Sequence, residues 1–173
     1  MKLEPAQIAD QGKQAFESKN FIEAAELFRQ AAEGFTAGNS ALMAAEMMNN
    51  MSVALLQAGR AQEALNAALG TDQIFAEAKD IKRQGMAVGN QAAALEGLNR
   101  YDEAIAAFER SAELFAQAGE GDLRSMVMKS AAAIKLKTGK ITDSAFKMMG
   151  SLDVKENPSF FERILKFILR FIK

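Results

Sequence analysis

The sequence contains no cysteine and no histidine, and it also lacks tryptophan. The missing thiols and imidazoles exclude zinc sites of the Cys/His type and nucleophiles activated by histidine. The 21 lysines and arginines nearly balance the 22 aspartates and glutamates, and a net charge of −1 argues against a broadly nucleic-acid-binding surface. We therefore expect a non-enzymatic protein with no metal, no cofactor and no nucleic-acid partner.

Long apolar runs are missing as well. No stretch of about 18 apolar residues occurs, so we expect no single helix that spans a bilayer. Residues 1–5 lead into a polar segment without the apolar region of a secretory signal. These features predict a cytoplasmic protein, and peripheral attachment to the cytoplasmic face of a membrane stays open.

What the sequence does contain is an internal repeat. Four-residue blocks begin at Phe21, Ala61, Tyr101 and Ile141, and each carries an acid two positions after its first residue. The same spacing relates an aromatic series and a polar series: Phe35, Phe75 and Phe115; Asp10, Asn50, Asn90 and Ser130. A fixed period of this length, about 40 residues, is the signature of a stacked repeat architecture.

Each copy predicts two helices joined by a short turn. In the first copy, residues 6–18 are amphipathic, and residues 21–35 place apolar side chains at helical spacing. Glycine or asparagine in the turns suits the left-handed conformation that closes a helix, as at Gly59 and Asn99. Turns this short predict antiparallel pairs. The fold class predicted is all-α, a right-handed solenoid of about four helix pairs.

The second helices carry a small residue, a phenylalanine four positions on, and a further small residue three positions later. Ala24, Phe28 and Ala31 show this pattern, and the segments 49–65 and 89–105 match a first helix, turn and second-helix start. In these features the chain resembles the tetratricopeptide repeat (TPR) family. Its period is closer to the long-repeat variant of kinesin light chains and spindle-orientation adaptors than to the usual repeat of about 34 residues. The resemblance implies a protein-binding fold over residues 1–150 and leaves the pathway open.

In the long-repeat adaptors, asparagines on the first helices hold the main chain of an extended peptide. The resemblance implies the same role for Asn50 and Asn90, with Asp10 and Ser130 at the equivalent outer positions. A carboxamide offers a peptide bond both a donor and an acceptor. The alternative is that these asparagines satisfy main-chain groups between neighbouring repeats.

Four methionines lie on one face of a single predicted helix: Met43, Met47, Met48 and Met51. An apolar stripe at helical spacing favours a place in the core. Methionine is also frequent on adaptable binding surfaces, so a contribution to the groove stays open.

The C-terminal segment 159–173 follows a linker, residues 151–158, that contains Pro158. As a helix it places Glu162 and its basic residues within an arc of about 100° and apolar residues over the rest of its surface. The basic residues are Arg163, Lys166, Arg170 and Lys173, and the apolar ones are Phe160, Phe161, Ile164, Leu165, Phe167, Ile168, Leu169, Phe171 and Ile172. Its length of about 21 Å is too short to span a bilayer but suits the membrane interface.

Together these features predict an adaptor whose groove binds a peptide or a partner helix and whose tail attaches it to an anionic membrane surface. Three alternatives remain open for the tail: docking on a second copy to form a dimer or filament, occupation of the chain's own groove, and a simple cap that seals the last repeat. An enzyme relying on lysine, glutamate, serine and Tyr101 is a further alternative, which no motif in the sequence supports.

Overall fold

The computed structural model describes residues 3–140. The chain divides into two compact units, residues 1–131 and residues 132–173. No β-strand occurs in residues 3–140, which confirms the all-α fold class. The second helix of the fourth pair, the linker and the tail 159–173 lie outside the described residues.

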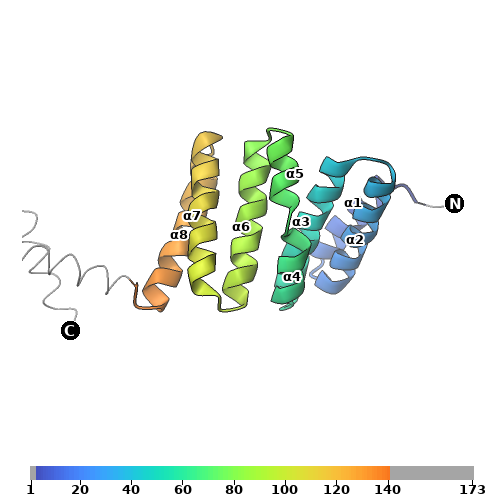
Figure 1. Cartoon of the computed structure of the whole chain (residues 1–173). Helices are drawn as coiled ribbons and strands as arrows, with labels where there is room; N and C mark the ends of the chain where they lie inside the picture. The colour runs from blue at the N-terminus through green and yellow to red at the C-terminus, as the bar shows by residue number, and fades with distance from the viewer. Residues whose placement is uncertain (1–2, 141–173) are drawn as a thin grey trace, which may run out of the picture. The chain divides into compact units, whose positions relative to one another are not determined.

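Eight helices follow one another along the described chain (Figure 1). They are α1 (Pro5–Glu17), α2 (Phe21–Ala37), α3 (Ala41–Gln57), α4 (Ala61–Ala68), α5 (Thr71–Glu77), α6 (Ile81–Gly97), α7 (Tyr101–Gln117) and α8 (Gly121–Lys137). Within the first unit α1 packs on α2, α2 on α3 and α3 on α4; α4 and α5 both pack on α6, and α6 packs on α7. This confirms an array of helices packed in neighbouring pairs.

The turns between the long helices share one geometry. A residue with positive φ closes the turn after each long helix and after α5: Lys19, Asn39, Gly59, Lys79, Asn99, Gly119 and Gly139. In the first six turns, the main-chain amide of the residue after the positive-φ residue donates to the carbonyl five residues before it. An example is the bond from Asp80 N to Phe75 O at 2.9 Å. This is the Schellman closure, which satisfies the last free carbonyls of a helix.

Lysine occupies two of these left-handed positions, where the sequence pattern had favoured glycine or asparagine. Lys79 has a φ of 58°, a conformation that costs an ordinary side chain about 1–2 kcal/mol. We expect Lys79→Gly to raise the free energy of unfolding by about 0.5–1 kcal/mol, net of the greater freedom of glycine in the unfolded chain. Urea unfolding followed by circular dichroism measures this change.

The matched control is Gln73→Gly, an exposed position inside α5. Glycine there should lower the free energy of unfolding by about 1 kcal/mol, because the backbone is helical. Equal destabilisation by both substitutions would contradict the conformational explanation.

Small side chains bring the helices of each pair close together. Ala24, Ala64 and Ala104 occupy the same position in three copies, and all three are fully buried. Phe75 packs against Ala45 and Ala87, on the first helices before and after it. The core at this point thus consists of alanines packed on an aromatic ring, and Phe75 belongs to the series that repeats every 40 residues.

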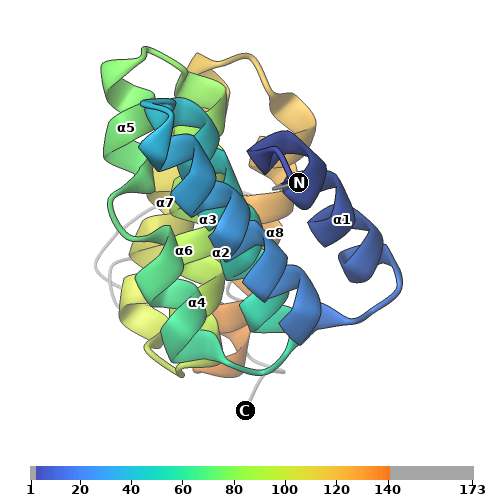
Figure 2. The same cartoon turned by 90° about the vertical axis from the view of Figure 1, so that its right-hand side faces the viewer.

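The second helix of the second copy is broken, which the repeat pattern did not predict. Leu69 has an extended backbone, and Gly70 follows with a φ of 81°, so α4 ends at Ala68 and α5 begins at Thr71 (Figure 2). At the position of Ala68 the other two copies have Phe28 and Phe108. The buried phenylalanine that anchors an unbroken helix is therefore absent at this point, and a glycine that disfavours helix follows it.

Candidate functional site

The four predicted groove residues lie on the first helices of the four copies. Asp10 is on α1, Asn50 on α3, Asn90 on α6 and Ser130 on α8. Asp10 is exposed and forms an ion pair with Lys13 at 3.0 Å. Asn50, Asn90 and Ser130 are half-buried, and the Ser130 hydroxyl donates to the Met126 carbonyl within its own helix. The sides of α1, α3, α6 and α8 that carry these four positions form the candidate binding surface, which we define by these residues and call the first-helix face.

The side chain of Asn90 is held by a second asparagine that sequence reasoning missed. Asn90 Nδ2 donates to Asn49 Oδ1 at 3.3 Å, and Asn49 is only 7% exposed. The Thr71 hydroxyl, just after the break between α4 and α5, lies at 3.3 Å from the same oxygen and donates at 2.7 Å to the Ala68 carbonyl. Asn90 thus bonds a side chain of the preceding copy.

The next residue, Gln91, bonds a main-chain carbonyl of the preceding copy. Its Nε2 donates to the Ala68 carbonyl at 3.1 Å and to Asp72 Oδ1 at 3.0 Å. Arg110 Nη2 reaches the other carboxylate oxygen of Asp72 at 2.9 Å. Asp72, 6% exposed, stands where the other two copies have alanine. A buried acid inside an apolar repeat is the signal that could have located this bridge from the sequence.

Exposed methionines flank the asparagine positions on the first-helix face. Met86 and Met126 precede Asn90 and Ser130 by one helical turn, and they are 47% and 58% exposed. Residues four apart lie on the same side of a helix, so each methionine adjoins a polar groove residue. Large apolar side chains repeated on one exposed face are typical of a protein contact surface.

An ion pair joins α3 to α6 along the same face. Arg83 Nη1 lies at 3.2 Å from Glu46 Oε2, and Arg83 Nε at 2.6 Å from Asp80 Oδ2. The guanidinium also sits 5.3 Å from the centre of the Phe75 ring. The main-chain amide and then the side chain of Arg83 donate to Asp80, and both bonds lower the pKa of that carboxyl. Arg83 is therefore held by partners on three sides.

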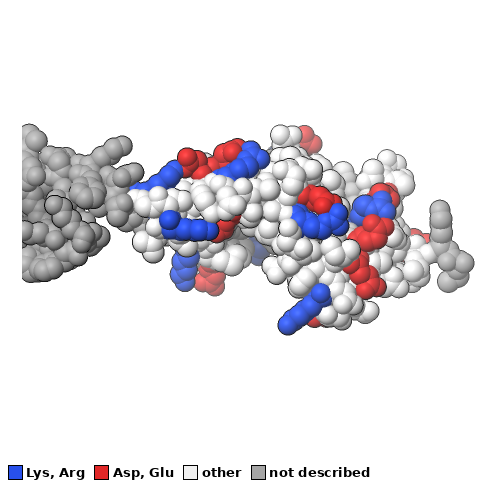
Figure 3. Space-filling view, turned by 90° about the horizontal axis from the view of Figure 1, so that it is seen from below, with Lys and Arg blue, Asp and Glu red and all other residues white. Residues whose placement is uncertain are grey.

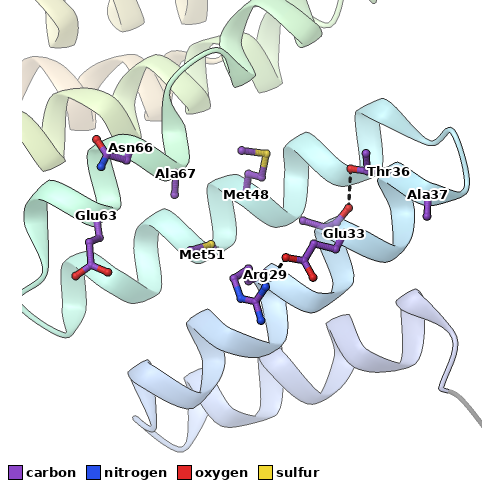
Figure 4. A pocket seen from close by; sticks show the side chains of 10 residues that line it. Arg29, Glu33, Thr36, Ala37, Met48, Met51, Glu63, Asn66 and Ala67 are labelled. Carbon is purple, nitrogen blue, oxygen red and sulfur yellow. Dashed lines mark hydrogen bonds and ion pairs between the residues drawn. The ribbon is translucent and has the colours of Figure 1, made fainter.

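The methionine stripe of α3 divides between the core and two surfaces. Met47 is buried and Met43 is 39% exposed, whereas Met48 and Met51 are half-buried and line a pocket of about 710 Å³ between α2, α3 and α4 (Figure 4). The prediction of a core role thus holds for Met47. At about 100° per residue Asn50 points away from Met48, so this pocket and the first-helix face lie on different sides of α3.

On the face seen in Figure 3, acidic and basic side chains of the described residues lie in small groups separated by uncharged surface. Helix α2 carries an ion-paired group, in which Arg29 bonds Glu26 with two nitrogens and Glu33 with a third. Hydrogen bonds from Arg29, and then from Gln30, lower the pKa of Glu26 to about 2. This carboxylate therefore stays negative throughout the physiological range.

Residues 3–140 contain no group of three or more acidic side chains placed to hold a metal ion. Over the same range no helix is long and apolar enough to cross a membrane. The predicted contact residues of the tail lie outside the described residues. No model of a known protein family matches the chain, and a comparison with curated proteins also gives no match.

Proposed function

We propose that this protein is a non-enzymatic adaptor of the long TPR-like type, whose first-helix face binds an extended peptide or a helix from another protein. The arrangement of Asn90 carries the proposal. Its amide is oriented by Asn49, and it stands beside the exposed Met86 on α6. A fixed carboxamide next to an adaptable apolar side chain suits a peptide, which offers main-chain groups and side chains together.

The repeat extends this arrangement along the array. Asn50 occupies the same position one copy earlier, and Met126 with Ser130 continues the pattern one copy later. A ligand that follows the first helices would thus meet a polar group in each copy and an exposed methionine in two of them. The resemblance to the long-repeat adaptors, based on residues 49–65 and 89–105, supports the same assignment.

Selection from a random peptide library on immobilised full-length protein tests this function. We expect a consensus peptide whose affinity falls about tenfold or more in Met126→Glu, because the new charge would be buried against the ligand. Met128→Glu is the matched control: Met128 is 50% exposed on the same helix, and two residues turn it about 160° away. Equal effects of the two substitutions, or no consensus, would contradict peptide binding at this face.

The tail adds a membrane-binding role to the proposal. Its basic residues and wide apolar arc suit an anionic interface, where each lysine or arginine contributes about 1 kcal/mol. We expect full-length protein to sediment with anionic vesicles in a salt-sensitive way and not with neutral ones. Lys166→Glu with Arg170→Glu should abolish this binding. If the protein binds neither kind of vesicle and its molecular mass in solution rises with protein concentration, the tail mediates self-association and not membrane binding.

A further inference from the structure

The pocket between α2, α3 and α4 is open and has an apolar floor. Met48 and Met51 of α3 form this floor, with Ala32 and Ala67 beside them (Figure 4). Arg29, Glu33 and Thr36 come from the α2 wall, and Glu63 and Asn66 from the α4 wall. The lining of α2 runs from Arg29 to Ala37, which corresponds to about 12 Å or two helical turns. We call this pocket the second-helix groove.

The next copy has a polar bridge at the equivalent place. The equivalent positions one copy later are Gln91 for Met51, Asp72 for Ala32 and Arg110 for Gly70. There, Gln91 and Arg110 both bond the carboxylate of Asp72, which links α5, α6 and α7 by side chains. The open groove is lined by Ala32 and Met51, and Gly70 stands at the third equivalent position, so the groove has no such bridge and its floor stays apolar.

The walls of the groove are acidic. Helices α2 and α4, with Arg60 at the N-cap of α4, together carry four glutamates and two arginines. Arg29 pairs with Glu26 and Glu33, and the low pKa of Glu26 keeps its charge at neutral pH. On the other wall, Glu63 pairs with Arg60 at 2.5 Å. A ligand crossing the groove therefore meets an apolar floor between two rims that together carry a net negative charge.

We propose that the second-helix groove binds a basic amphipathic helix of a partner protein. Two turns of this helix would place apolar residues at i, i+3 or i+4, and i+7 on Met48 and Met51, whose flexible side chains fit varied shapes. Lysines or arginines at its flanks would meet Glu33 and Glu63. The groove and the first-helix face lie on different sides of α3, so this site does not depend on the proposed peptide binding.

A pair of model peptides tests the proposal directly. The probes are amphipathic helices of about 14 residues, long enough to approach helical order in water, built of leucine and lysine or of leucine and glutamate. Both are labelled for fluorescence anisotropy with full-length protein. We expect the lysine peptide to bind at least tenfold more tightly than the glutamate peptide, with an affinity that falls as salt rises. Equal affinities for the two peptides would overturn the proposal.

Two sets of variants locate the binding. Ala32→Asp with Met51→Gln introduces the polar residues that the next copy has at these positions. This double substitution should lower the affinity for the lysine peptide at least tenfold. Glu33→Lys with Glu63→Lys changes only exposed rim charges and should reverse the preference between the peptides, which keeps the test valid if the first variant folds poorly. Met126→Glu, on the first-helix face, should leave both affinities unchanged and so separates this site from the proposed function.

Unchanged binding in both groove variants would overturn the assignment. A second outcome would also overturn it: binding of the lysine peptide only when Lys166→Glu and Arg170→Glu are introduced into the chain's own tail. The groove would then be reserved for residues 159–173 and not for a separate partner.

Discussion

Phe75→Ala should lower the free energy of unfolding by about 3–5 kcal/mol, the range for deleting a buried aromatic ring. Phe75 is 1% exposed, and it packs against Ala45 and Ala87 with Leu42 and Ile74 beside them. These alanines are too short to fill the space that the ring would leave. Because the ring joins α5 to the first helices on either side, its loss should also loosen the contact between neighbouring copies. Chemical denaturation followed by far-ultraviolet circular dichroism measures the change.

Phe35→Ala is the matched control for this prediction. Phe35 stands one copy earlier in the same aromatic series but is only half-buried. Its removal should therefore cost about 1–2 kcal/mol. If the two substitutions prove equally costly, burial between two first helices is not what makes Phe75 important.

Gln91→Met should lower the free energy of unfolding by about 2 kcal/mol, because it removes the donor of a hydrogen bond to a charged, buried group. That donor serves both the Ala68 carbonyl and the Asp72 carboxylate, and a bond of this kind contributes about 1.5–3 kcal/mol. Arg110 would remain as a partner of Asp72, but its side chain is 53% exposed and pairs less strongly. Methionine is the residue that the second copy has at this position, so the fold accommodates its shape.

The control is Gln11→Met, the same substitution at the equivalent position of the first copy. Gln11 is exposed on α1, and a surface change of this kind should stay within about 0.5 kcal/mol. Thermal or urea unfolding of both variants separates the two cases. If Gln91→Met costs no more than this surface substitution, the bridge at Asp72 adds no stability.

The regular part of the fold could be predicted from the sequence because each copy repeats the same apolar spacing and turn residues. The series Phe35, Phe75 and Phe115 located the second helices, and the turn glycines and asparagines located their ends. The repeat pattern did not predict the break between Ala68 and Thr71. Gly70 and Asp72 are nevertheless both unfavourable residues for the interior of an unbroken helix. The partners of Asp72, Gln91 and Arg110, come from other helices and are not adjacent to it in sequence.

The candidate site was predicted less completely than the fold. The repeat period relates Asp10, Asn50, Asn90 and Ser130 to one another on four helices, but it carries no information about side-chain partners. The role of Asn49 in holding Asn90 depends on the distance between α3 and α6. Likewise, the second-helix groove is lined by small and apolar residues such as Ala32 and Met51, which form no sequence motif that would predict a pocket.

The neighbour-to-neighbour packing of the first unit has a consequence for how the chain acquires its structure. Each helix meets partners that lie within about one helix pair along the sequence, so few contacts require long loops to close. Chains with such local contacts fold in microseconds to milliseconds, and ordering can begin in any copy. During synthesis, a pair such as α1 and α2 would be able to pack as soon as both helices have left the ribosome.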